Sequence, residues 1–160
     1  MAIRSYSPQD VNVMLGGFYA IDGFVDGTFI NITKDVQPYG TKRTADGTVA
    51  RIHRKDETYT IELTLASTAP ANDILTKLYQ VDAATEYGKF PLFVKDTLGT
   101  SLFLATLAWI KEIPSLSFSN GVENRVWTMQ AYGGSFSVGG NESSAGLVQD
   151  FINTVTGSGE

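Results

Sequence analysis

The chain has 160 residues, of which 42% are apolar and 18% charged, with a net charge of −5 at pH 7. This composition excludes a disordered chain. A chain of this length can form one domain with a sizeable hydrophobic core. The longest apolar stretch, residues 102–110, is about half the ~20 residues of a bilayer-spanning helix, so no membrane contact is predicted. The absence of cysteine excludes disulfides and thiol chemistry.

The N-terminal residues lack the charged and then apolar layout of a signal peptide, so we expect synthesis in the cytoplasm without export. The acidic net charge argues against a general nucleic-acid binder, because neutralising phosphates requires a basic surface.

Charge is distributed unevenly along the chain. Residues 34–55 hold six basic and two acidic side chains, whereas the remaining residues hold six basic and fifteen acidic ones. Two interpretations are open: a solvated loop and edge strand protected by cations from aggregation, or a basic segment that docks on the acidic body of another copy. The basic residues are Lys34, Lys42, Arg43, Arg51, Arg54 and Lys55.

The first third of the chain predicts a small β-meander. Apolar residues alternate over 11–15, and residues 18–21 and 28–33 are rich in β-formers between glycine-containing turns. Residues 34–48 show no apolar periodicity and are predicted to form a long loop, which carries part of the basic segment. An Asp46-Gly47 turn then leads into a basic strand at 49–54.

The middle of the chain predicts a strand, a helix and another strand in close succession. Residues 59–65 alternate between apolar side chains and a small, polar, weakly acidic face. Pro70 suits the first turn of a helix, and Ile74, Leu78 and Val81 repeat at helical spacing, so one helix should cover one face of a sheet. A strand at 90–95 follows.

Residues 102–110 are apolar on both faces apart from Thr106. We therefore expect burial on both sides, in the core and, as one option, also against a second subunit. Pro114 ends this strand, and Asn120-Gly121 predicts a tight turn before a strand at 125–132 with one packed and one polar face.

Residues 1–133 are predicted to form one β domain, and 134–160 a connector rich in glycine and serine followed by an appendage. Apolar residues at helical spacing between 147 and 155 favour a short C-terminal helix, docked on its own domain or on a neighbour.

No catalytic, metal-binding or cofactor-binding constellation is evident. His53 is the only histidine, and an interface or surface position is favoured over a role as general base. One histidine and no cysteine argue against a zinc site, and the Asp22 and Asp26 turns lack the spacing of a calcium loop. We therefore expect neither an enzyme nor a cofactor.

Several segments in order resemble one known family. They are 45–49 with Arg51 and Asp56, the alternating strand at 60–65, 70–75, and 90–96 with Gly99-Thr100; the opening at 6–24 resembles the family's first hairpin. Together they resemble the tail tube proteins of contractile-tailed, myovirus-like bacteriophages, over roughly residues 5–133. That family is related in fold to the tube proteins of type VI secretion systems and bacteriocins.

The resemblance implies a mainly β fold of the sandwich or barrel type with one flanking α-helix. It implies hexameric rings that stack into the hollow inner tail tube, inside a contractile sheath, through which DNA passes without specific binding. The expected partners are other copies of the chain, the sheath protein, and baseplate and tail-terminator proteins. The expected location is the virion, after assembly in the host cytoplasm.

Within this interpretation, two sets of residues have roles. The basic segment becomes a candidate arm between rings or subunits, comprising Lys34, Lys42, Arg43, Arg51, His53, Arg54 and Lys55. Small polar or acidic side chains suit a channel wall that must not retain DNA, because lysine and arginine would bind phosphate. By alternation alone, the candidates for this wall are Thr60, Glu62, Thr64, Thr128 and Gln130.

Two alternatives remain open. A tube of a genome-free contractile particle, such as a bacteriocin or secretion apparatus, would share the fold. A small monomeric β-barrel that binds a ligand would instead predict a monomer at every concentration.

Overall fold

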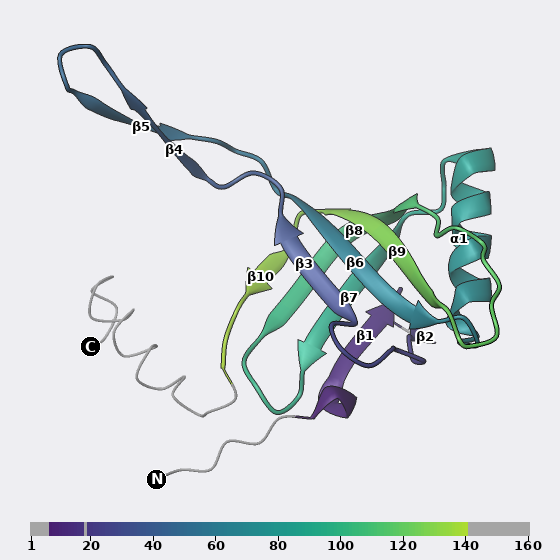
Figure 1. The fold of residues 1–160 in the computed structure, drawn as a ribbon. Helices are drawn as coiled ribbons and strands as arrows, with labels where there is room; N and C mark the ends of the chain where they lie inside the picture. The colour runs from purple at the N-terminus through teal and green to yellow at the C-terminus, as the bar shows by residue number, and fades with distance from the viewer. Residues whose placement is uncertain (1–6, 18, 141–160) are drawn as a thin grey trace, which may run out of the picture.

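A computed structural model describes residues 7–17 and 19–140 (Figure 1). The body is an antiparallel sheet with strand order β2-β1-β7-β8-β9-β6-β3, to which β10 adds by pairing with β8. A two-stranded hairpin, β4-β5, forms a separate sheet, and one helix, α1, flanks the body. The elements are η1 (Pro8–Asp10), β1 (Val11–Leu15), β2 (Tyr19–Ala20), β3 (Ile30–Lys34), β4 (Tyr39–Arg43), β5 (Val49–His53), β6 (Thr58–Ala66), α1 (Ala71–Thr85), β7 (Phe90–Asp96), β8 (Leu102–Glu112), β9 (Asn124–Tyr132) and β10 (Ser135–Ser137).

The predicted mainly β fold with one flanking helix is confirmed. The two ends of the strand order, β2 and β3, do not pair with each other in the described part of the chain. The body is therefore sandwich-like and not a closed barrel, the other form that the sequence left open.

Alternation along the strands builds the core on one face of the curved sheet. In β6, Ile61, Leu63 and Leu65 have no exposed surface, and the neighbouring paired strand β9 contributes Trp127 and Met129. Fully burying side chains of this size stabilises the fold by about 1.5–3 kcal/mol each. Further buried side chains come from neighbouring strands: Val13, Leu15, Phe90, Leu92, Val94, Phe103, Ala105, Ala108 and Ile110.

Helix α1 packs on this core through a face shifted from the predicted one. Ala71 and Leu75 are fully buried, whereas Val81, expected in the apolar stripe, is 47% exposed. The difference arises because α1 contacts the sheet mainly through its first half, where Ala71 permits close approach. No side chain caps its N-terminus at Pro70.

Asn72 ties the start of α1 to the sheet. Its Oδ1 accepts a hydrogen bond from Nε1 of Trp127 (2.9 Å). Its Nδ2 donates to the carbonyl oxygens of Ala66 (2.9 Å) and Ala69 (3.0 Å), at the end of β6 and in the following turn. One amide thus satisfies the buried indole N–H and fixes how the helix meets the sheet.

The predicted loop at 34–48 is wrong over Tyr39–Arg43, which is strand β4. It pairs with β5 over five residues, from Tyr39 opposite His53 to Arg43 opposite Val49. The pattern lacked apolar periodicity because neither face of this hairpin packs on the core. Backbone hydrogen bonds, which leave no signature in side-chain pattern, define the strand instead.

At the C-terminal end of the described chain, β10 pairs with β8, and Gly139 and Gly140 exchange hydrogen bonds with Ser101 and Thr100. The predicted helix at 147–155 lies outside the described residues. Among the helices that the structure describes, none has the length and apolar character needed to cross a bilayer.

We predict that Asn72→Ala lowers the free energy of unfolding by about 1–3 kcal/mol, because the buried N–H of Trp127 loses its acceptor. Chemical denaturation followed by tryptophan fluorescence measures the change. Lys77→Ala, on the exposed side of the same helix, should stay within about 0.5 kcal/mol of the wild type. Equal stability of Asn72→Ala and the wild type would contradict the assigned role.

Candidate assembly and channel surfaces

Polar side chains predominate on the outward face of β3, β6 and β9, which also carries the exposed Val126 and Tyr132. We call this set of polar residues the polar wall. In the sheet register, Thr60 lies opposite Gln130, and Glu62 lies opposite Thr128. All five predicted wall residues therefore lie on one face, opposite the core. The polar wall comprises Asn31, Thr33, Thr60, Glu62, Thr64, Thr128 and Gln130.

The sequence pattern missed two members of this surface. Asn31 pairs with Glu62 and Thr33 with Thr60, because β3 is the next strand beyond β6. Alternation of Asn31 and Thr33 with Ile30 and Ile32 was visible in the sequence, but only the strand order shows that they extend the wall. No lysine or arginine stands at the outward positions of these three strands.

Asp35, also missed, joins the polar wall to the chain leaving β3. Its Oδ1 accepts a hydrogen bond from Thr60 Oγ1 (2.5 Å), and its Oδ2 accepts one from Gln130 Nε2 (3.0 Å). Its backbone N–H donates to the carbonyl of Thr58 (3.1 Å). Two wall residues thus share one carboxylate, which fixes the direction in which the chain leaves the body.

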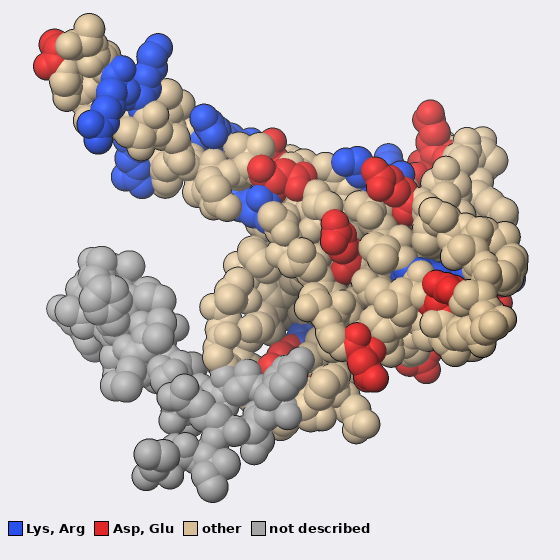
Figure 2. All heavy atoms as spheres, viewed as in Figure 1, with Lys and Arg blue, Asp and Glu red and all other residues tan. Residues whose placement is uncertain are grey.

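From this point, the β4-β5 hairpin projects from the body; we call residues 39–53 the arm (Figure 1). Of the predicted arm residues, Lys42, Arg43, Arg51 and His53 lie within it. The others flank it: Arg54 and Lys55 follow β5, and Lys34 ends β3, with its Nζ 4.9 Å from the centroid of the Tyr59 ring. In Figure 2, lysine and arginine gather along the arm, whereas acidic side chains are spread over the visible face of the body.

The two faces of the arm differ. One face carries Tyr39, with its ring centroid 5.0 Å from that of His53, and the guanidinium of Arg51 lies over the Tyr39 ring at 3.4 Å. Arg43 and Val49 pair further along this same face. The opposite face presents Gly40, Lys42, Ala50 and Ile52. We call the first one the aromatic-cationic face.

Almost nothing in the described part of the subunit covers the arm. All five residues of β5 are exposed, including Val49 at 55% and Ile52 at 42%, and Tyr39 in β4 is 48% exposed. A two-stranded hairpin without a packing surface is at best marginally stable in water. The arm therefore exposes apolar side chains that its own body does not bury.

The tip of the arm is a turn held by Asp46. The Asp46 carboxylate accepts hydrogen bonds from the Thr44 hydroxyl and from the Thr48 N–H (3.0 Å). The adjacent Gly47 has φ +88°, a left-handed conformation that favours glycine. The Thr44 and Thr48 hydrogen bonds lower the pKa of Asp46 from its ordinary value of 3.8 to about 2.

Among the described residues, no three histidine, cysteine, aspartate or glutamate side chains are grouped as metal ligands would be.

The fold and these surfaces define a class: a β-sandwich-like protein with a projecting hairpin. Over 155 residues, the chain is 27% identical to "Structural protein ORF10" of Pseudomonas phage KPP10, covering 92% of this chain and 90% of that protein. No protein-family model matches the sequence.

Among solved structures, the fold is similar to the anti-feeding prophage cap, described as the tube terminating cap. The TM-score is 0.51 at 16% identity, with 82% of this chain and 91% of the cap covered. The relative is thus a structural protein of a phage, the cap shares the fold of this chain, and neither is described as an enzyme.

We predict that the Asp46 carboxyl group titrates near pH 2, and the NMR chemical shift of its side-chain carboxyl carbon can follow the titration. Because the folded pKa is lowered, ionisation stabilises the turn fully above pH 3.8, and this stabilisation is lost as the pH falls through about 2. Thr44→Val should raise the pKa, since it removes the largest cause of the shift. An unchanged titration in Thr44→Val would contradict the assignment.

Proposed function

We propose that this protein is the subunit of the inner tail tube of a contractile phage tail. In this proposal, six copies form a ring, rings stack into a hollow tube, and the tube conducts DNA during ejection. The similarity to a phage structural protein along nearly the whole chain, and the fold shared with a tube terminating cap, support this function.

One observation carries the proposal: among residues 7–17 and 19–140 of its own subunit, nothing packs against the arm. Its apolar and aromatic side chains gain burial only against another protein surface. Its cations gain electrostatic complementarity on an acidic body. A second copy of the same chain offers such a body and is present wherever this protein is made.

The polar wall supports a channel lining. Its side chains are small, polar or acidic, and the surface has no lysine or arginine that would hold DNA phosphates. In this proposal, the wall faces the channel, and Asp35 couples it to the base of the arm. The residues proposed to line the channel and those proposed to contact other subunits are then neighbours along the chain, because the arm connects β3 to β6.

The proposed partners beyond other copies are the sheath protein, which surrounds the tube, and the baseplate and tail-terminator proteins at its ends. The proposed location is the virion, after assembly in the host cytoplasm.

Three alternative functions can be compared with the described fold. A terminator is a second candidate, because a tube terminating cap has a similar fold. A tube of a genome-free particle would have the same architecture, and its genomic neighbours would lack capsid genes. A monomeric ligand-binding barrel is disfavoured, because the sheet is not closed and its inner face is filled by buried side chains.

Negative-stain electron microscopy of the purified protein tests the proposal directly. A tube subunit should give six-membered rings and long tubes, whereas a terminator should give single rings. Monomers at all concentrations would contradict both.

We predict that Arg51→Glu with Arg54→Glu raises the concentration needed for tube formation by about tenfold, since two exposed pairs of up to ~1 kcal/mol each are lost. Lys77→Glu with Lys95→Glu makes the same change in net charge on the body and is the control. Sedimentation measures the polymer, and thermal unfolding checks the subunit. Tubes of normal yield from the arm variant would count against an assembly role of these arginines.

We predict that Glu62→Lys leaves the tubes intact but lowers DNA ejection in a phage carrying the substitution. The reason is that each subunit would place a cation among wall residues that otherwise lack one. Glu62→Gln is the control, because it removes the charge without adding a cation. Normal ejection by Glu62→Lys virions would argue that this face does not line the channel.

A further inference from the structure

The outward face of β8 is the largest departure from the burial that the sequence predicted. Its apolar residues were expected to be buried on both sides, in the core and, as one option, against a second subunit; within one subunit, Leu104 is 39% and Leu107 44% exposed. Trp109 is only partly buried, and Tyr132, opposite Leu107 on β9, is 50% exposed. The outward face of this central strand is therefore left open by the described part of the chain.

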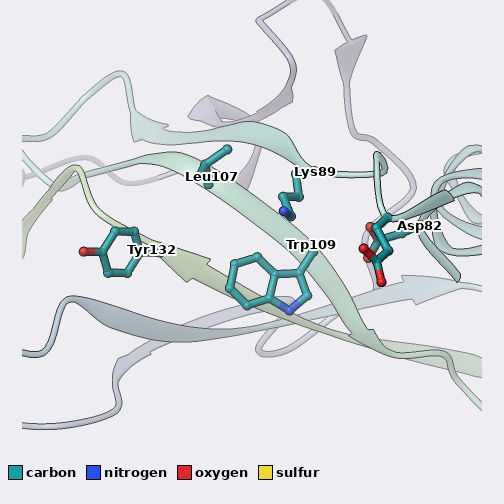
Figure 3. A pocket seen from close by; sticks show the side chains of 6 residues that line it. Asp82, Lys89, Leu107, Trp109 and Tyr132 are labelled. Atoms are coloured by element: carbon teal, nitrogen blue, oxygen red, sulfur yellow. The ribbon is translucent and has the colours of Figure 1, made fainter.

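A pocket of about 420 Å³ lies at this face (Figure 3). In Figure 3, the rings of Trp109 and Tyr132 project from adjacent strands, and Asp82 lies at the end of α1. The floor is thus aromatic and apolar, while one side carries carboxylates. The lining residues are Asp82, Glu86, Lys89, Leu107, Trp109 and Tyr132.

The carboxylates occupy an electrostatically unfavourable position for the subunit alone. Asp82 and Glu86 stand at the C-terminal end of α1, where the helix dipole is negative and cations are preferred. The last turn of α1 contains no basic residue. Lys89 lines the same pocket and offsets one of the two negative charges, so a net negative site remains.

Glu86 is also conformationally unfavourable. It ends α1 with φ 64°, the left-handed conformation usually taken by glycine at this position. Its N–H donates to the carbonyl of Asp82 (2.9 Å), whose side chain in turn accepts from the N–H of Gly88 (3.2 Å). These backbone contacts require no carboxylate at position 86, so local structure does not explain the choice of glutamate.

Resting on the proposed function, we propose that this pocket receives the aromatic-cationic face of the arm from a second copy of the chain. An arginine suits the site because its planar guanidinium stacks on aromatic rings and pairs with carboxylates. Arg43 and Arg51 supply that group on the arm, and Val49 supplies an apolar contact between them. Stacking on Tyr39 already holds the Arg51 guanidinium in place before docking.

The positions of the two surfaces agree with a chain of such contacts. The arm and α1 lie on opposite sides of the body (Figure 1). A contact between two different surfaces is heterologous, so each subunit gives one arm and receives another. Such contacts close into rings or continue as helical filaments.

The absence of cysteine makes a direct test possible. The full-length variant Val49→Cys with Leu107→Cys places one thiol on the arm face and one in the pocket, and leaves every proposed charge in place. Val49→Cys with Asp26→Cys is the control, because Asp26 is exposed in a turn outside the pocket. Both proteins are assembled, oxidised mildly, and run on a non-reducing gel, with electron microscopy of the same samples.

We expect the pocket pair to give a ladder extending beyond dimers, at least about tenfold stronger than the control, because a disulfide forms only when the Cα atoms approach within about 7 Å. Tubes without a ladder above the control would overturn the pocket assignment and leave the proposed function standing. Neither tubes nor ladder would overturn both. A ladder that ends at dimers would also overturn the inference, because it would indicate a two-fold contact.

Exchanging the charges of the two proposed partners gives a second test. Two variants that each misfold would not recover disulfide formation when they are combined. Arg51→Glu and Glu86→Arg should each reduce the ladder, by about tenfold, and their combination should restore most of it. Failure of the combination to exceed both single variants would overturn the pairing. If Leu107→Cys in assembled tubes reacts with a thiol label until sheath protein is added, the occupant is the sheath and the inference is overturned.

Discussion

The pairing of β6 with β9 determines which side chains face inward and which face outward. The two strands pair over nine residues, from Thr58 opposite Tyr132 to Ala66 opposite Asn124. Because successive side chains point to opposite faces, burial of Ile61, Leu63 and Trp127 forces the polar residues outward. A slip of one residue would exchange the faces, so the core and the polar wall are specified by the same register.

The arm follows a different physical rule. Its strands are held by backbone hydrogen bonds, by the Asp46 turn and by the contacts of Tyr39 with Arg51 and His53, with no core beneath them. Such a hairpin is defined in its pairing but lacks the burial that stabilises the body. The core of the body contains no arm residue, and the stability of the arm depends on what it contacts.

One half of helix α1 is packed like the body, and the other half is exposed like the arm. At its start, Ala71, Leu75 and Asn72 pack or bond against the sheet, and the hydrogen bond to Trp127 fixes the helix position. At its end, Asp82 and Glu86 place negative charge beside the partly buried Trp109 of β8 and the exposed Tyr132 of β9. The first half thus packs against the sheet, and the second half forms a surface that the described part of the subunit leaves uncovered.

The sequence by itself determined most of the strands, helix α1, and the polar face of Thr60, Glu62, Thr64, Thr128 and Gln130. Alternation with period two reports directly on half-buried strands, and apolar residues at helical spacing report on the helix. It also located the basic segment, since charge is readable without any fold. It missed β4, because a strand stabilised by backbone pairing alone has no apolar pattern.

Only the tertiary structure decided which of these patterns meet. Strand order adds Asn31 and Thr33 to the polar wall, and Asp35 joins it through Thr60 and Gln130, residues 25 and 95 positions away. The sequence could not distinguish burial of β8 within a subunit from an outer face left open, because both require the same apolar residues. The physical reason is that alternation fixes which face of a strand a side chain occupies, whereas contacts between strands distant in sequence decide what covers that face.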